Sequence, residues 1–215
     1  MNPRSRWLGR MNYEAALAMQ EEIVARKIAD AQAPDECLLL EHDPVYTIGR
    51  TPDASSLGDE MRLPHPVVRT NRGGQATYHG PGQLVGYPIV DLRRRGRDLH
   101  RHLRALETLL IALCAECGVG AARREGLTGV WVGERKIASL GVGVRHWIAM
   151  HGFALNVCGD LAPFARIVPC GLAGVEMTSL ERESGAAFEV AAVAALAGSF
   201  FESLPSGLPC AGGGS

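Results

Sequence analysis

Two side chains of this sequence carry reactive groups in settings that favour chemistry: the thiol of Cys170 and the amine of Lys136. Cys170 stands in the run Ile-Val-Pro-Cys-Gly at 167–171. The proline fixes its own φ and favours an extended residue before it, and the following glycine permits a tight turn. Such a segment can present one sulfur as a nucleophile. From this run alone, a buried structural cysteine is the commoner explanation.

Arginine supplies almost every positive charge of the chain. Of 22 basic residues, 20 are arginines, which leaves Lys27 and Lys136 as the lysines. An ammonium group can give up its proton when it is buried, whereas a guanidinium effectively cannot. A lysine kept against this bias marks a position where proton transfer would be useful. Lys27 fits the polar face of a helix, so Lys136 is the better candidate.

A glycine-rich run, Arg-Gly-Gly-Gln-Ala-Thr-Tyr-His-Gly-Pro-Gly-Gln, covers residues 72–83. The paired Gly73 and Gly74 let a ligand lie close to the backbone, and Arg72 is able to bind an anion or a carbonyl. The run matches neither the P-loop nor the G-x-G-x-x-G pattern. Read alone, it is as readily a turn, and its His79 a turn residue held by a hydrogen bond.

Composition places the chain among soluble globular proteins, with 47% hydrophobic and 21% charged residues and a net charge of −1. The charge gives no field that would attract nucleic acid, and no apolar window has the roughly 18 residues of a membrane span. The N-terminus lacks the apolar core of a secretory signal. We therefore expect a cytoplasmic protein with reduced cysteines, a single domain over 1–205 and a disordered tail over 206–215.

The elements that must position the candidate residues alternate between helices and strands. Asn12 is a good cap for a helix over 13–30. Alternation places Lys136, Ala138 and Leu140 on one face of a strand, with Ile137 and Ser139 on the other. The remaining predictions are strands at 37–41, 45–48 and 67–70, a loop at 50–66, a strand and turn before a returning strand at 84–92, a helix at 98–117, a hairpin over 130–144, a strand at 147–157 and a helix at 188–204.

Both later helices carry an apolar stripe of helical period. In the first it comprises Leu99, Leu103, Leu106, Leu110, Leu113 and Cys117; in the second, Val190, Val193, Ala197, Phe200 and Leu204. Cys114 and Cys117 form C-x-x-C, but no second pair completes a zinc site and the pair sits at a helix C-terminus, so core packing is expected. The arginines of 93–97 predict a solvated face or a dock for an acidic protein.

Four motifs in register resemble the lipoyl(octanoyl) transferases, cytosolic enzymes of lipoate biosynthesis. They are the run from Arg72, the run Gly-Glu-Arg-Lys-Ile-Ala-Ser-Leu-Gly at 133–141, the run His-Gly-Phe-Ala-Leu-Asn-Val at 151–157, and Val-Pro-Cys-Gly at 168–171 followed by Thr-Ser-Leu at 178–180. Their order and spacing match over residues 12–200. The resemblance implies an α/β fold shared with biotin and lipoate protein ligases, a single domain with a mixed sheet and flanking helices.

The resemblance also implies roles for individual residues. Cys170 would carry the acyl group as a thioester, and Lys136 would lower the pKa of that thiol. The acyl site would be lined by Arg72, Gly73, Gly74, Gln75, Ala76, Thr77, Tyr78, His79, Ser139, Leu140, Gly141, Gly152, Phe153 and Ala154. Phe153 stands where an aliphatic residue is expected and would narrow the chain pocket.

The implied reaction moves an octanoyl group from octanoyl-acyl carrier protein to a lysine of a lipoyl domain, including those of 2-oxoacid dehydrogenases and the glycine cleavage H protein. No cofactor, metal, nucleic acid or membrane is implied. In the second step Lys136 could accept the proton of the incoming amine, and His79 and His151 are the alternative bases. For His151 a structural role is the stronger interpretation.

Three alternatives stay open. An ATP-dependent lipoate or biotin-type ligase would share the fold but needs no nucleophilic thiol. An octanoyl amidotransferase between lipoyl-carrying proteins would share the chemistry. A non-catalytic acyl-binding protein would need neither Cys170 nor Lys136.

Overall fold

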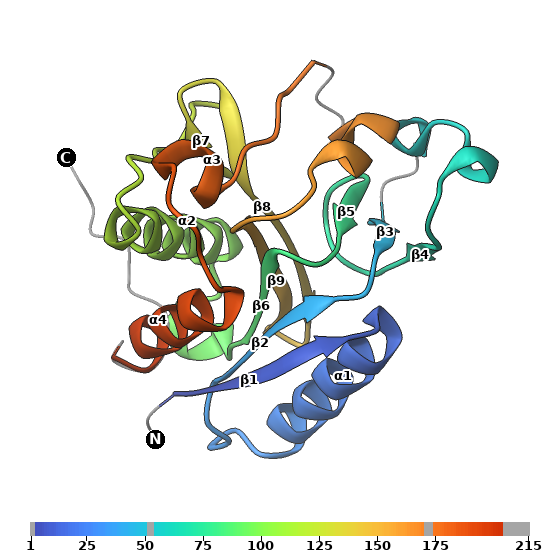
Figure 1. The fold of residues 1–215 in the computed structure, drawn as a ribbon. Helices are drawn as coiled ribbons and strands as arrows, with labels where there is room; N and C mark the ends of the chain where they lie inside the picture. Colours follow the sequence, from blue (N-terminus) through green and yellow to red (C-terminus); the bar gives the residue numbers. More distant parts are fainter. Residues whose placement is uncertain (1–2, 51–53, 170–173, 204–215) are drawn as a thin grey trace.

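A six-stranded mixed sheet, called here the large sheet, runs through the part of the chain that the structure describes (Figure 1). The structure is a computed structural model and describes residues 3–50, 54–169 and 174–203. The strand order is β1 (Arg4–Met11), β2 (Glu36–His42), β6 (Gln83–Ile89), β9 (Ile148–Asn156), β8 (Arg135–Arg145) and β7 (Val130–Val132). β1 and β2 pair in parallel, and every other neighbouring pair of this sheet is antiparallel.

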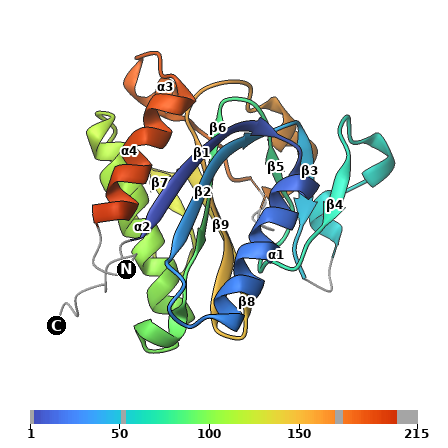
Figure 2. The ribbon, with the colours of Figure 1, turned by 90° about the horizontal axis from the view of Figure 1, so that it is seen from below.

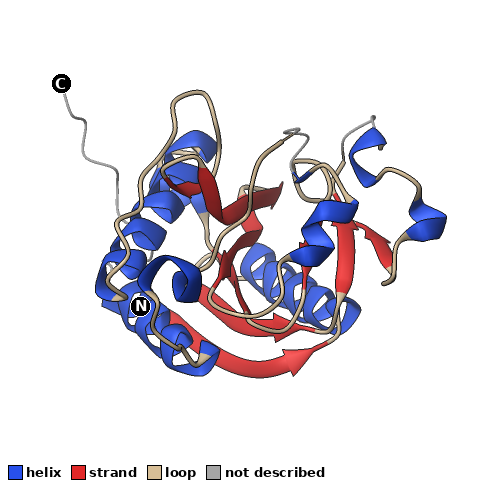
Figure 3. Ribbon diagram, turned by 45° about the horizontal axis from the view of Figure 1, so that its top comes forward, coloured by secondary structure: helices blue, strands red, loops and turns tan. Residues whose placement is uncertain are grey.

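A three-stranded sheet, the small sheet, lies beside the large one (Figures 1 and 3). Its order is β4 (Val67–Arg69), β3 (Val45–Ile48) and β5 (Thr77–His79), with β4 parallel and β5 antiparallel to β3. We expected the strand over 84–92 to return beside the strand that precedes the turn, and this expected pairing was wrong. β5 joins the small sheet, whereas β6 pairs with β2 and β9 in the large sheet. The glycine-rich run thus connects the two sheets.

Helices cover both faces of the large sheet (Figure 2). α1 (Tyr13–Ala29) packs on β6 and β9, and α2 (Leu99–Glu116) and α4 (Val190–Ser203) cover the other face. The shorter helices are α3 (Leu180–Ser184) and 3-10 turns at Ser55–Leu57, Glu60–Arg62, Leu92–Arg95 and Ala162–Arg166. No helix in the described ranges has both the length and the apolar character needed to cross a bilayer.

The helices α1 and α2 each begin directly after a residue whose side chain caps the first turn. The Asn12 side chain accepts a hydrogen bond from the Ala15 N–H at 2.8 Å, and the Asp98 side chain accepts one from the Arg101 N–H at 2.9 Å. Each satisfies a backbone donor that the first helical turn leaves open. The predicted helices over 13–30, 98–117 and 188–204 are confirmed to within a few residues.

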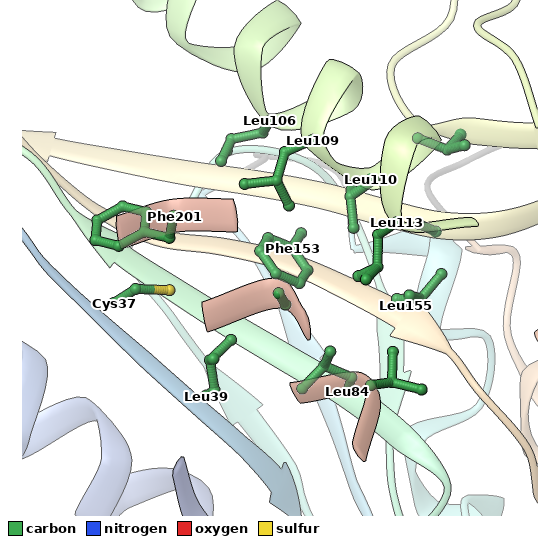
Figure 4. Close-up of a cluster of buried hydrophobic side chains, with 14 of the residues drawn as sticks. Cys37, Leu39, Leu84, Leu106, Leu109, Leu110, Leu113, Phe153, Leu155 and Phe201 are labelled. Carbon is green, nitrogen blue, oxygen red and sulfur yellow. The ribbon is translucent and has the colours of Figure 1, made fainter. Parts of the chain in front are cut away.

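The main hydrophobic core lies between the large sheet and the α2–α4 pair (Figure 4). Phe153 is 4% exposed and lies among leucines of α2 and the sheet. A Cβ atom at Gly86 on β6 would come within 2.2 Å of the Phe153 ring, so the glycine makes room for it. Truncating such a ring to alanine typically costs about 3–5 kcal/mol.

The edge of the large sheet and the buried stripe of α4 differ from the sequence-based expectations. The edge strand β1 was not predicted. In α4 the fully buried aromatic is Phe201, with Phe200 only half-buried, and the predicted Leu204 lies outside the described residues, as does the tail. The predicted α2 stripe is confirmed, because Leu106, Leu110 and Leu113 lie in the core and Leu99, Leu103 and Cys117 pack half-buried against it; His102 and Glu107 are buried as well. Cys114 packs in the core as predicted, and burial raises the pKa of its thiol to about 12.

The arginine cluster after β6 is largely structural. Arg93 forms an ion pair with the buried Asp91 at 2.7 Å, and Arg95 pairs with the buried Asp35 at 3.3 Å. Arg94 donates to the Ala33 carbonyl at 3.0 Å. These contacts fasten the 3-10 turn at Leu92–Arg95 to the chain that follows α1, so the prediction of a wholly solvated face was wrong for this part of the cluster.

Candidate active site

One cavity of about 380 Å³ collects most of the predicted site residues. It lies where the glycine-rich run, β8 and β9 meet, because the Gly73 N–H donates to the Val142 carbonyl at 2.9 Å and so holds the run along β8. The predicted residues that border the cavity are Arg72, Gly73, Gly74, Gln75, Thr77, His79, Lys136, Ser139, Leu140, Gly141, Gly152, Phe153 and Ala154.

Three predicted residues are placed differently. Ala76 and Tyr78 are buried in the hydrophobic cluster of the small sheet rather than in the cavity wall. The Tyr78 ring packs edge-on against Phe164, with ring centroids 5.6 Å apart. Cys170 lies outside the described residues, so its sulfur has no position here. The chain before it is anchored at Val168, because the Val168 N–H donates to the Ser56 carbonyl at 2.8 Å.

Lys136 is enclosed near the start of β8, with 1% of its surface exposed. Its Nζ lies 5.2 Å from the centroid of the Trp131 ring, a cation–π geometry. Its backbone pairs with residues 176–178: the Lys136 N–H donates to the Glu176 carbonyl at 2.8 Å, and the Thr178 N–H donates to the Lys136 carbonyl at 2.9 Å. The chain that follows Cys170 is thereby fixed beside the lysine.

A β-bulge changes which residues share a face on β8. Val130 pairs with Ala138 while Trp131 pairs with Lys136, so one extra residue stands on β8 between these pairs. Strict alternation placed Lys136 and Ser139 on opposite faces, yet both border the cavity. The extra residue resets the alternation, which sequence periodicity could not reveal.

Arg72 is anchored by the small sheet. Its Nη2 donates to the Thr47 carbonyl at 2.9 Å and to the Thr47 hydroxyl at 2.8 Å, and its Nη1 donates to the Gly73 carbonyl at 3.0 Å. Gly49 permits this arrangement, because a Cβ there would lie 2.2 Å from the Gly74 carbonyl oxygen. The guanidinium, 8% exposed, places a fixed positive charge in the cavity wall.

His79 belongs to a buried hydrogen-bond chain. The Gln83 amide nitrogen donates to Asn156 Oδ1 at 2.9 Å, so Gln83 Oε1 is the acceptor that faces His79 Nδ1 at 2.8 Å. His79 Nε2 is then free of a proton and faces the Thr47 hydroxyl at 3.4 Å. Burial, then the neighbouring His42, lowers the pKa of His79 well below its ordinary value, so this ring is neutral.

His151 contributes a second neutral ring to the cavity. Its backbone is left-handed, with φ +58°, and its N–H donates to Gln20 Oε1 at 2.8 Å. Nε2 contacts Asn71 Oδ1, and within the described residues Nδ1 has no hydrogen-bond partner. Burial, followed by the charge of Arg72, lowers the pKa of His151 to about 4. His151 therefore both borders the cavity and makes structural hydrogen bonds to Gln20 and Asn71.

Sequence reasoning missed several residues of the wall. They are Tyr13, Tyr87, Leu99, Leu103, Gly126, Leu127, Thr128 and Val142. Leu99 and Leu103 belong to the predicted apolar stripe of α2. Their half-buried side chains, in the N-terminal half of this helix, also line the cavity. The run 126–128 carried no motif, so only the fold brings it to the site.

Comparison with known proteins places the chain in a family. Residues 12–202 match the lipoyl protein ligase A/B catalytic domain. The chain is 53% identical over 199 residues to an octanoyltransferase of Geobacter sulfurreducens, covering 93% of this chain and 83% of that protein. It is 52% identical over 197 residues to an octanoyltransferase of Syntrophotalea carbinolica, covering 92% of each.

Its fold is similar to that of a lipoate-protein ligase A crystallised with ATP, at a TM-score of 0.75 and 17% identity over 94% of this chain and 84% of that one. The expected ligase-like α/β fold with a mixed sheet and flanking helices is therefore confirmed. The chain belongs to the lipoyl protein ligase A/B catalytic domain family and, within it, to the octanoyltransferases.

Proposed function

We propose that this octanoyltransferase moves the octanoyl group of octanoyl-acyl carrier protein to a lysine of a lipoyl domain through a thioester on Cys170. The acceptors would be lipoyl domains of 2-oxoacid dehydrogenases and the glycine cleavage H protein. The observation that carries the proposal is the enclosed amine of Lys136 at a cavity bordered by the run from Arg72 and by the run from His151, with residues 176–178 paired to the Lys136 backbone.

In the first step the Cys170 thiolate attacks the carbonyl carbon of the donor thioester. The carbon–sulfur bond to the carrier breaks, and the carrier leaves as a thiol with the proton that Cys170 gave up. Lys136 stabilises the thiolate as an ammonium group. The positive charge of Arg72 in the cavity wall would polarise the carbonyl of the bound acyl group.

In the second step the amine of the acceptor lysine attacks the acyl-cysteine. A carbon–nitrogen bond forms, the carbon–sulfur bond breaks, and Cys170 leaves as a thiolate. One proton must leave the attacking amine, and Lys136 takes it as the general base. The neutral state of His79 and His151, with lowered pKa values, makes them weak bases and favours Lys136 in this role.

The cavity wall suits an acyl chain and excludes water. Leu99, Leu103, Leu140 and Phe153 give it an apolar side. A thioester intermediate needs such shielding, because hydrolysis would waste the acyl group. A volume of about 380 Å³ lies in the range of small-molecule sites.

Intact-mass measurement after mixing with octanoyl-acyl carrier protein tests the proposal. We expect a gain of one octanoyl group that hydroxylamine removes, and no gain in Cys170→Ala. Lys136→Arg should retain part of the self-acylation and lose transfer to a lipoyl domain, because a guanidinium cannot take the proton. Turnover close to wild type in Cys170→Ala, or lipoyl-domain octanoylation that requires ATP and free octanoate, would refute covalent transfer.

A further inference from the structure

A buried carboxylate on α2 has no part in the mechanism above. Glu107 is 1% exposed on a helix whose inner face is otherwise mainly apolar. Its Oε2 accepts hydrogen bonds from Arg104 Nη1 at 2.7 Å and Arg123 Nε at 3.0 Å. Its Oε1 accepts one from the Gly129 N–H at 3.1 Å. An enclosed carboxylate is expensive to bury, and a sheet-facing helix does not need one.

The third partner of Glu107 connects it to Lys136. Gly129 has φ +133°, and a Cβ atom there would lie 2.6 Å from Lys136 Cε and 3.2 Å from its Nζ. The end of the lysine side chain therefore rests directly against the Gly129 backbone, with the Trp131 ring also beside Nζ. The position of the Gly129 backbone therefore limits where the Lys136 amine can lie.

The loop over residues 122–131, which carries Gly129, is closed by backbone hydrogen bonds between its two ends. Ala122 and Trp131 exchange backbone hydrogen bonds of 2.8 and 2.9 Å. Glu107 then holds the loop at two points, Arg123 and Gly129. Residues 126–128 of this loop border the cavity. One carboxylate thus sets both the backbone against which Lys136 rests and part of the cavity wall.

We propose that Glu107 is a positioning residue of this octanoyltransferase, which acts through Gly129 to fix the amine of Lys136 for proton transfer. The proposal rests on the proposed role of Lys136. Misplacing a catalytic group by about 1 Å can cost about a hundredfold in rate. The expected signature is a lower kcat with little change in KM for the carrier, since Glu107 contacts the lysine's support and not the donor.

Glu107→Gln is the first test. The glutamine keeps the size of the side chain but turns one acceptor oxygen into an N–H donor, which cannot serve three converging donors. We expect kcat per folded molecule to fall about tenfold to a hundredfold, with KM within about threefold of wild type. Glu116→Gln is the matched control, because Glu116 is an exposed glutamate at the end of the same helix; its kcat should be unchanged.

The second measurement reads Lys136 directly. Because Lys27 and Lys136 are the lysines of the chain, protein labelled with ¹⁵N at the lysine side chain gives two ε-amine signals. In Glu107→Gln the Lys136 signal should move while the Lys27 signal stays, because Lys27 is held by a separate set of contacts. Gly129→Ala should move the same signal, and a thermal melt reports how much of each variant is folded.

Unchanged kcat in folded Glu107→Gln, or an unmoved Lys136 signal, would overturn the proposal. Failure of the proposed function looks different. If Lys136→Met transfers octanoyl groups normally, the lysine is not the base, yet the Lys136 signal of Glu107→Gln still reports whether the carboxylate positions the amine.

Discussion

Lys27 and Lys136 are buried to the same extent, 1% exposed each, and are surrounded in opposite ways. The Lys27 ammonium donates to the carbonyls of Ala33 and Pro34 at 3.0 and 2.8 Å and to Asp35 Oδ1 at 2.9 Å. The three N–H donors of the ammonium group are thereby satisfied by three consecutive residues, 33–35. Lys136 rests its amine on an aromatic ring and a glycine backbone and borders the cavity.

The difference shows that two lysines of equal burial can have different surroundings, and of the two Lys136 is the one that borders the cavity. The Lys27 side chain is a staple: it ties the end of α1 to Asp35, which in turn holds Arg95 and the Asp91 N–H. Its earlier assignment to a polar helix face was wrong. A compact ammonium meets those three acceptors, and a planar guanidinium would not, so Lys27 has a physical reason to be a lysine in an arginine-rich chain.

The largest expected effect comes from Lys136→Met. Methionine keeps the unbranched stem against Trp131 but removes the amine. We expect octanoyl transfer to fall about 10²- to 10⁴-fold, the usual loss when a general base is removed. Steady-state transfer to a lipoyl domain measures the rate, and urea denaturation should show a smaller loss of stability than in Lys27→Met. Normal transfer by Lys136→Met would show that the amine of Lys136 is not needed for the reaction and that the two lysines do not differ in function.

Lys27→Met should reverse the pattern. It leaves the Asp35 carboxylate, 3% exposed, without its ammonium partner. Breaking a buried ion pair from one side typically lowers the free energy of unfolding by about 3–5 kcal/mol. Urea denaturation measures this loss, and kcat per folded molecule should be that of wild type.

A double variant sharpens the result. In Lys27→Met with Asp35→Asn the site no longer holds a buried carboxylate that has lost its ammonium partner and keeps only Arg95 and the Asp91 N–H. We expect the double variant to be less destabilised than the sum of the two single variants, which a double-mutant cycle measures directly. Strict additivity, or a fall in kcat at unchanged stability, would show that Lys27 is not a structural staple.

The sequence predicted most of what local chemistry controls. Asn12 caps α1 as predicted, and helical periodicity marks the apolar faces that pack on the sheet. The glycine-rich run and the 139–141 and 152–154 segments carry motifs, so most of the cavity wall was named before the fold was known.

What failed depends on contacts that are distant in sequence. β1 is an edge strand rich in arginine and poor in β-branched residues, which gives it no strand signal; charged edge strands of this kind protect a sheet from pairing with other chains. The bulge beside Trp131, which brings Lys136 and Ser139 to one cavity, arises from strand pairing. The burial of Glu107 has no signal in the sequence, because two of its three partners, Arg123 and Gly129, come from the loop after α2.

A change to acidic pH gives the smallest expected effect, and it tests the packing around Arg95 and Asp35, which Lys27 contacts. His102 is buried on α2, near the Arg95 that pairs with Asp35, and within the described residues neither ring nitrogen has a hydrogen-bond partner. Burial, then the charge of Arg95, lowers the pKa of His102 to about 3. Its unfolded pKa is about 6.5. The folded state therefore resists protonation, and stability is lost as pH falls below 6.5 toward 3.

His102→Leu should remove this loss. Linkage between those two pKa values makes the gain in unfolding free energy about 2 kcal/mol larger at pH 5 than at pH 8. Urea denaturation at the two pH values measures it, and kcat at pH 8 should not change because His102 is not part of the cavity wall. His100→Leu, which removes a histidine from an exposed position of the same helix, is the matched control. An equal response in the two variants would mean that His102 already binds its proton in the folded state, and the packing around Arg95 and Asp35 would then be looser than that around Lys27.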